Sequence, residues 1–139
     1  MQQKLTNNNN NRLHKILIVE DNPDCSNLLK IAFEQKGFAV LKSKDGLEGI
    51  TKAAAEQPDI VLLDLMMPDM DGYAFLQALH KNTSLNPLVI VNSNMEQKKD
   101  EEKALQMGSH FYLKKSQYTP FEVADKVLEL WEQQRPSKN

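Results

Sequence analysis

Two short runs that are apolar at every position constrain the fold of this chain most. The first is Ile16–Val19, which Glu20 and Asp21 follow, and the second is Ile60–Leu63, which Asp64 follows. A strand that is apolar on both faces suits a parallel sheet covered by helices on both sides. Ligand sites in such sheets lie just beyond the carboxyl ends of the strands. We therefore expect Asp64 to be the functional centre.

The rest of the chain alternates between helical and strand patterns. Apolar residues at helical spacing predict helices starting at Pro23, after Asp45-Gly46, after Gly72, over Met95–Met107 and around Phe121–Trp131. Short apolar runs predict three further strands, at Phe38–Leu41, Leu88–Val91 and His110–Leu113. Strand and helix alternating five times imply an α/β fold with parallel pairing, right-handed crossovers and helices on both faces.

The 139 residues suit one domain with a hydrophobic core, which we place at residues 15–134. Residues 1–14 contain the unbroken run Asn7–Asn11 and are predicted to be a disordered tail. Residues 135–139 are predicted to be a second, short tail. Because no domain-length segment follows the last helix, we expect no attached output domain in this chain.

Composition excludes several classes of function. The net charge of −2 and the pI of about 5.9 argue against a nucleic-acid or anionic-membrane surface. No apolar run approaches the roughly 20 residues that span a bilayer, and the N-terminus lacks the apolar region of a signal peptide. Cys25 is the only cysteine, which excludes a disulfide framework and a cysteine-based metal site. We expect a cytoplasmic protein.

The carboxyl edge of the predicted sheet gathers polar residues: Glu20, Asp21, Asp64, Ser93 with Asn94, and Lys114 or Lys115. The three acids would repel one another there, and a hard divalent cation with oxygen ligands would remove that repulsion, which describes a magnesium site. A carboxylate, magnesium, a lysine and a hydroxyl together can hold a phosphoryl group and neutralise its charge during transfer. Asp64 is then the natural nucleophile and would form an acyl phosphate.

On these residues the chain resembles the receiver domains of two-component response regulators, over roughly residues 15–134. The motifs that carry the resemblance are Glu20-Asp21, Asp64 followed by Pro68 and Gly72, Ser93, Gly108, Tyr112 and a lysine after the fifth strand. Each motif is weak alone, but together, in this order and at family-like intervals, they are specific. The resemblance implies a stand-alone, flavodoxin-like, doubly wound (βα)5 three-layer sandwich with strand order 2-1-3-4-5.

The resemblance also implies the chemistry of the site. Asp64 would accept a phosphoryl group from a phosphohistidine on a sensor histidine kinase or phosphotransfer protein. Asp21 and Glu20, together with Asp64 and the backbone carbonyl of Met66, would hold Mg²⁺. These expectations make the chain a phosphoacceptor signalling domain rather than an enzyme that turns over a separate substrate.

Three further roles follow from the resemblance. Ser93 would bind a phosphoryl oxygen and move toward it, Tyr112 would be the aromatic switch that reports this movement, and Lys115 would pair with the acyl phosphate. The face formed by the fourth helix, fifth strand and fifth helix would bind a downstream protein, and a weak homodimer is compatible with such a switch. We choose Lys115 over Lys114 because it lies three positions after Tyr112 and seven after Gly108, as in the family.

Two departures from the family pattern permit more than one interpretation. Ser116 follows Lys115 where the family usually has proline, often after a cis bond, and a cis bond before a non-proline residue costs about 2.5–4 kcal/mol. Either the site supports that strain, or the loop takes a trans path and Lys115 sits differently. Asn94 replaces a smaller residue and could narrow access to the site. Both departures motivate the alternative of a receiver-like interaction module that no longer signals by phosphorylation.

Several single residues also have a second, purely structural interpretation. Ser93 could instead cap the next helix, and Tyr112 could be a core aromatic. Val123, Val127 and Leu130 lie beside the core stripe of the last helix and could leave apolar surface for a partner. A hydrolase that uses an aspartyl phosphate is disfavoured because Met66 stands where the common phosphatase motif carries a second aspartate.

Overall fold

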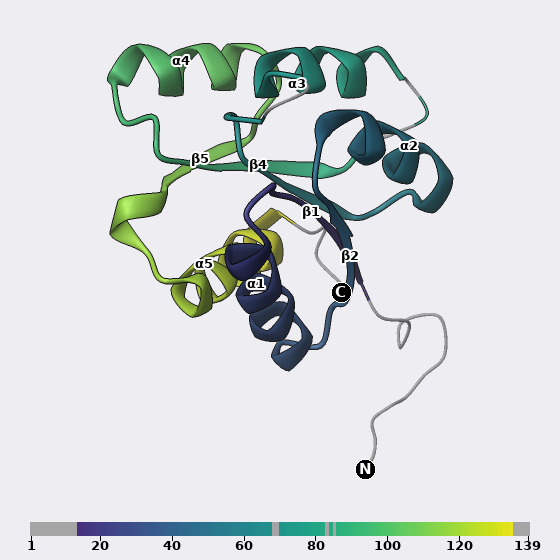
Figure 1. The fold of residues 1–139 in the computed structure, drawn as a ribbon, viewed down its shortest axis with the longest axis vertical. Helices are drawn as coiled ribbons and strands as arrows, with labels where there is room; N and C mark the ends of the chain where they lie inside the picture. Colours follow the sequence, from purple (N-terminus) through teal and green to yellow (C-terminus); the bar gives the residue numbers. More distant parts are fainter. Residues whose placement is uncertain (1–13, 68–69, 83, 85, 135–139) are drawn as a thin grey trace.

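The structure is a computed structural model that describes residues 14–67, 70–82, 84 and 86–134. In these residues five strands alternate with five α-helices, and a short 3₁₀ helix precedes the last of them (Figure 1). The elements in chain order are β1 (Lys15–Val19), α1 (Pro23–Gln35), β2 (Ala39–Ser43), α2 (Gly46–Glu56), β3 (Ile60–Leu63), α3 (Gly72–Lys81), β4 (Leu88–Ser93), α4 (Lys98–Gln106), β5 (Phe111–Lys114), η2 (Lys115–Gln117) and α5 (Pro120–Gln134).

The strands form one parallel sheet in the order β2-β1-β3-β4-β5, which confirms the predicted fold class and strand order. Leu63, the last residue of β3, pairs with the last residue of β1 on one side and with Val91 of β4 on the other. Asp64 therefore lies at the same level of the sheet as Glu20 and Asn92. This register brings the acids that follow β1 and β3 to one edge.

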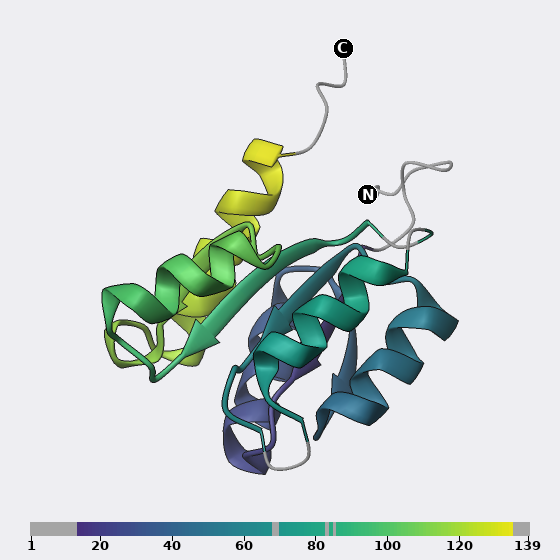
Figure 2. The same ribbon diagram turned by 90° about the horizontal axis from the view of Figure 1, so that it is seen from above.

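Helices α1 and α5 cover one face of the sheet, and α2, α3 and α4 cover the other (Figures 1 and 2). Each face of the sheet has its own hydrophobic core, and alternate strand residues pack in one core or the other. Ile16 and Ile18 pack on the first face, and Leu17 and Val19 pack on the second. All four are fully buried, as expected for strands that are apolar at every position.

The apolar side of α5 belongs to the core rather than to a partner surface. Val123, Val127 and Leu130 are all buried and pack in the core under α1 and α5. The sequence left this question open, and the structure decides it because the side chains meet α1 and the sheet. Any partner surface on α5 must therefore use other residues, such as the exposed Phe121.

Local side-chain bonds begin α1, α2 and α3, as the Thr119–Glu122 pair begins α5. Asn22, Asp45 and Asp71 each accept a hydrogen bond from the backbone N–H three residues further on, at 2.8–2.9 Å. Pro23 occupies the first turn of α1, as predicted from its position after Asn22. Each cap contributes about 1 kcal/mol, so the acids and amides at these turns shape the loops that surround the site.

The predicted start of α4 was wrong by three residues. The apolar stripe predicted a helix from Met95, but α4 begins at Lys98. The backbone N–H of Met95 donates to the Ser93 hydroxyl at 3.0 Å, and its carbonyl accepts from the Tyr112 hydroxyl. Both groups are thereby taken by tertiary partners, and the segment stays a loop.

Several strand boundaries also differ from prediction, and β2, β4 and β5 extend one or two residues beyond their apolar runs. The strand expected at Phe38 begins at Ala39, since the Phe38 N–H still donates to the end of α1. The strand expected at His110 begins at Phe111, and His110 instead exchanges two bonds with Val89. Its N–H donates to the Val89 carbonyl at 2.8 Å, and its imidazole Nδ1 accepts from the Val89 N–H at 3.0 Å.

Both predicted tails lie almost wholly outside the described residues. His14 is described, and its carbonyl accepts a hydrogen bond from Ala39 at 2.8 Å while its ring contacts Trp131 edge-on at 5.2 Å. Pro68 also lies outside the described part of the chain. None of the described helices is long and apolar enough to cross a membrane.

Candidate functional site

Three acids converge at the carboxyl edge of the sheet. Glu20 and Asp21 follow β1 and Asp64 follows β3, and each offers an oxygen atom within 4.8 Å of the others. Glu20 and Asp64 are only 4% and 7% exposed, whereas Asp21 is exposed to solvent. Three carboxylate oxygens at this spacing, with one side open to water, fit a hard divalent cation such as magnesium.

Lys115 supplies the positive charge of the cluster. Its Nζ lies 2.7 Å from Oε1 of Glu20 and 3.0 Å from Oδ2 of Asp64. Burial alone would lower the pKa of Lys115, but its bonds to Glu20 and the charge of Asp64 outweigh burial and hold that pKa above its ordinary value. The lysine is therefore charged at neutral pH and holds the two carboxylates together.

The structure answers the question that Ser116 raised. The described residues contain no cis peptide bond, so the bond between Lys115 and Ser116 is trans. Lys115 nevertheless reaches both carboxylates, so a trans path does not remove it from the site. Lys114 instead pairs in the strand ladder with Ser93.

Backbone donors fix the direction of two carboxylates. The N–H of Met66 donates to Oδ1 of Asp64, and the N–H of Asn22 donates to Oε2 of Glu20, both at 3.1 Å. These bonds leave Oδ2 of Asp64 facing Lys115. The direction of the Met66 carbonyl, which the resemblance assigns to the metal, stays a prediction.

Gly72 lets the loop after Asp64 fold tightly against α3. A Cβ atom on Gly72 would lie 2.4 Å from Cα of Leu65, well inside contact distance. The N–H of Gly72 donates to the Leu65 carbonyl at 2.8 Å. Glycine at this position therefore sets the shape of the loop that presents Asp64.

Ser93 and Tyr112 both hold the loop that follows β4. Ser93 is fully buried, and its hydroxyl accepts from the N–H of Met95, as described above. Because Gln97 is the N-cap residue of α4, Ser93 does not cap that helix, which excludes the capping role that the sequence had allowed. Tyr112 is half-buried, and burial raises the pKa of its hydroxyl, which remains a neutral donor to the Met95 carbonyl.

The sequence did not point to two contacts near the site. The hydroxyl of Ser116 donates to the carboxylate of Glu96, which ties the loop after β5 to the loop after β4. The Cys25 thiol lies beside Glu20, and burial, with the charge of Glu20, raises its pKa to about 11. The thiol therefore stays protonated and is not a nucleophile. The Ser116–Glu96 contact joins residues 20 positions apart, and apolar periodicity marks neither contact.

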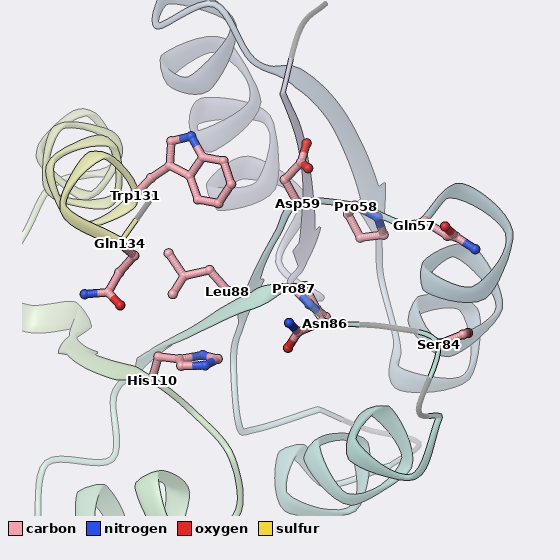
Figure 3. Close-up of a pocket in the computed structure, with 10 residues that line it drawn as sticks. All are labelled: Gln57, Pro58, Asp59, Ser84, Asn86, Pro87, Leu88, His110, Trp131 and Gln134. Atoms are coloured by element: carbon pink, nitrogen blue, oxygen red, sulfur yellow. The ribbon is translucent and has the colours of Figure 1, made fainter. Parts of the chain in front are cut away.

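A cavity of about 420 Å³ lies at the opposite edge of the sheet (Figure 3). Asp59, Leu88 and His110, which lie at the amino ends of β3, β4 and β5, help to line it, as does Trp131 of α5. None of the clustered acids contributes to its wall. This cavity is therefore separate from the charged cluster, where the reactive groups meet.

Fold and site together define a flavodoxin-like α/β domain with an acid and lysine cluster at the carboxyl edge of its sheet. The family model for the response regulator receiver domain matches residues 16–134. The chain belongs to this family of receiver domains, which serve as signalling domains in two-component systems.

Similar proteins include both short and long members of the family. Protein PilH of Pseudomonas aeruginosa is 36% identical over 103 residues, which cover 73% of this chain and 84% of PilH. The alkaline phosphatase synthesis transcriptional regulatory protein PhoP of Bacillus subtilis is 32% identical over 113 residues, covering 81% of this chain but 46% of PhoP. The chain thus spans about half the length of such transcriptional regulators.

Solved structures of receiver domains superpose closely on the chain. The receiver domain of the Francisella response regulator 1452 has a TM-score of 0.79 at 27% identity, covering 88% of this chain and 99% of that domain. A CheY-like receiver domain protein from Methanospirillum hungatei has a TM-score of 0.78 at 25% identity, covering 88% and 97%.

Proposed function

We propose that this chain is a cytoplasmic phosphoacceptor of a two-component phosphorelay, and that Asp64 takes the phosphoryl group. The observation that supports this most is the placement of Asp64, which is held against Lys115 beside two further acids at the open edge of the sheet. The donor is a phosphohistidine on a sensor histidine kinase or phosphotransfer protein. A carboxylate oxygen of Asp64 attacks phosphorus, the P–N bond breaks, and its electron pair leaves on the imidazole nitrogen.

The residues around Asp64 supply charge and orientation. Glu20, Asp21 and Asp64, with the backbone carbonyl of Met66, would hold magnesium, which neutralises negative charge on the transferred group when bound. Lys115 already lies 3.0 Å from Asp64 and would pair with the oxygens of the acyl phosphate. Lys115 and the acids thus already lie beside Asp64 before a phosphoryl group arrives.

Ser93 and Tyr112 form the proposed switch. Once Asp64 carries the phosphoryl group, the Ser93 hydroxyl turns to donate to one of its oxygens and gives up its bond to the Met95 N–H. The loop that Ser93 and Tyr112 share then shifts, which changes the face of α4, β5 and α5 that meets a downstream protein. Exposed Leu105 and Phe121 lie on the helices of that face.

The Tyr112→Phe variant tests the proposed switch separately from phosphoryl transfer to Asp64. The variant lacks only the hydroxyl that donates to Met95, so we expect phosphoryl uptake within about twofold of the wild type and a free energy of unfolding lower by about 1 kcal/mol. Uptake is measured by intact-mass spectrometry and stability by urea unfolding. A variant that takes up no phosphoryl group would place Tyr112 in the transfer chemistry instead.

The proposed function is tested with acetyl phosphate as a small-molecule donor. With magnesium present, the wild type is expected to gain one phosphoryl group in intact-mass spectra, and EDTA is expected to prevent this gain. Binding of magnesium without uptake from any donor, phosphohistidine proteins included, would favour the alternative that Asn94 and Ser116 motivate, a receiver-like module that does not signal by phosphorylation.

A further inference from the structure

Asn92, near the end of β4, carries a buried polar atom without a partner. The residue is 4% exposed, and its carboxamide oxygen accepts no hydrogen bond from the residues that the structure describes. A buried acceptor left unsatisfied destabilises the fold, and such groups in native proteins call for a specific explanation. The position of Asn92 in the sheet supplies one.

In the sheet, Asn92 lies between Asp64 and the backbone position from which the Lys115 side chain extends. Strand β4 is placed between β3, which ends before Asp64, and β5, which ends before Lys115. The register puts Asn92 at the level of Asp64. Leu62 and Ile90, each two residues earlier, pack in the same core, so strand alternation puts Asp64 and Asn92 on one face.

The Lys115 side chain must cross β4 to reach its partners. It starts next to β5, and its Nζ bonds Asp64, which follows β3, and Glu20, which follows β1. Leu113 pairs with Asn92 and packs in the same core, and Lys115, the first residue of η2, reaches that face too, since its Nζ bonds Asp64 and Glu20. Asn92 therefore lies beside the path of the lysine.

A cation in the acidic cluster would change the bonding of the lysine. An ammonium group has three N–H donors, and the acids that accept from Lys115 are the same acids that a divalent cation would bind. The carboxamide oxygen of Asn92 offers the ammonium group another acceptor. Because this oxygen is neutral, it does not attract the cation away from the carboxylates.

We propose that Asn92 is a positioning residue for Lys115. Its carboxamide oxygen accepts from the ammonium group when Glu20 and Asp64 take up a divalent cation, and it thereby keeps the lysine within reach of a phosphoryl group on Asp64. The second half of this role rests on the proposed function of Asp64. An apolar residue of the same size at this position would fill the space but could not hold the lysine.

A magnesium titration followed by ¹H–¹⁵N NMR tests the first half without any phosphorylation. The side-chain amide resonance of Asn92 is expected to shift as magnesium saturates the wild type and to stay in place in Lys115→Met. The same shift in both proteins, or none in the saturated wild type, would overturn the proposal. The side-chain amide of Asn27, which lies on α1 and accepts from Lys42, serves as the reference signal.

Asn92→Leu tests the second half. Because the variant removes an unsatisfied acceptor, its free energy of unfolding without magnesium should equal or exceed that of the wild type. Its phosphoryl uptake from acetyl phosphate should be about tenfold slower, since a bond to a charged donor is lost. Adding Asn92→Leu to Lys115→Met should slow uptake no further, because the two residues act as one unit.

Two results would contradict this role: wild-type uptake rates in Asn92→Leu, or an equal additional slowing in the Lys115→Met background. A wild type that takes up no phosphoryl group at all would overturn the proposed function, while the magnesium titration would still decide whether Lys115 moves to Asn92.

Discussion

Asp64→Asn is expected to abolish phosphoryl uptake from acetyl phosphate. The amide has no anionic oxygen to attack phosphorus, so no acyl phosphate can form. The fold should survive, because the amide oxygen can still accept the bond from the Met66 N–H that the carboxylate accepts now. Intact-mass spectra of both proteins after incubation with donor and magnesium measure the difference.

Asp71→Asn is the matched control for this substitution. Asp71 caps α3 through its side chain, and asparagine caps helices as well as aspartate does. The Asp71→Asn substitution also removes one negative charge near the same loop. Uptake at the wild-type rate in this variant would show that the loss of a charge alone does not explain the loss of uptake in Asp64→Asn. Equal modification of the wild type and Asp64→Asn would rule out Asp64 as the acceptor.

Lys115→Met is expected to weaken the fold and to tighten magnesium binding. Without the ammonium group, Glu20 and Asp64 remain buried with no counter-charge, which costs about 3–5 kcal/mol in EDTA. The cation then meets no competitor for these oxygens, so its affinity should rise by about tenfold and its binding should restore much of the lost stability. Phosphoryl uptake should fall, because the group that pairs with the acyl phosphate is gone.

Urea unfolding with EDTA or magnesium, together with calorimetric titration of magnesium, measures both effects. Lys114→Met is the control, and we expect its stability to stay within about 0.5 kcal/mol of the wild type. Since the pKa of Lys115 is raised by folding, its contribution is present at neutral pH and is lost only as the solution becomes strongly alkaline. Equal loss of stability in both variants would contradict the assigned pairing.

The sheet was predictable from the sequence because its signal is local. Ile16–Val19 and Ile60–Leu63 are apolar at every position, which required cover on both faces, and the acids after them had to meet at one edge. Lys115 is a different case. Lys115 was chosen over Lys114 from the spacing in the family. Only the structure shows that its side chain reaches Asp64 although the bond to Ser116 is trans.

The features that the sequence missed depend on contacts that a hydrophobic pattern does not record. Met95 fitted a helical stripe, yet its backbone groups are bound by Ser93 and Tyr112, so the helix begins later. Asn92 follows the apolar run Leu88–Val91 that predicted a strand, yet it is itself a buried member of β4. Periodicity records which face a residue prefers, and it does not record which other segment will meet that face.

The bond between Ser116 and Glu96 has a mechanical consequence. Proline, which the family usually carries after the lysine, has no hydroxyl, and in this chain serine donates one to the loop after β4. The backbone next to Lys115 and the backbone beyond Ser93 are thus linked across neighbouring strands. We therefore expect a displacement of the backbone at the lysine to act, through this bond, on the residues that precede α4.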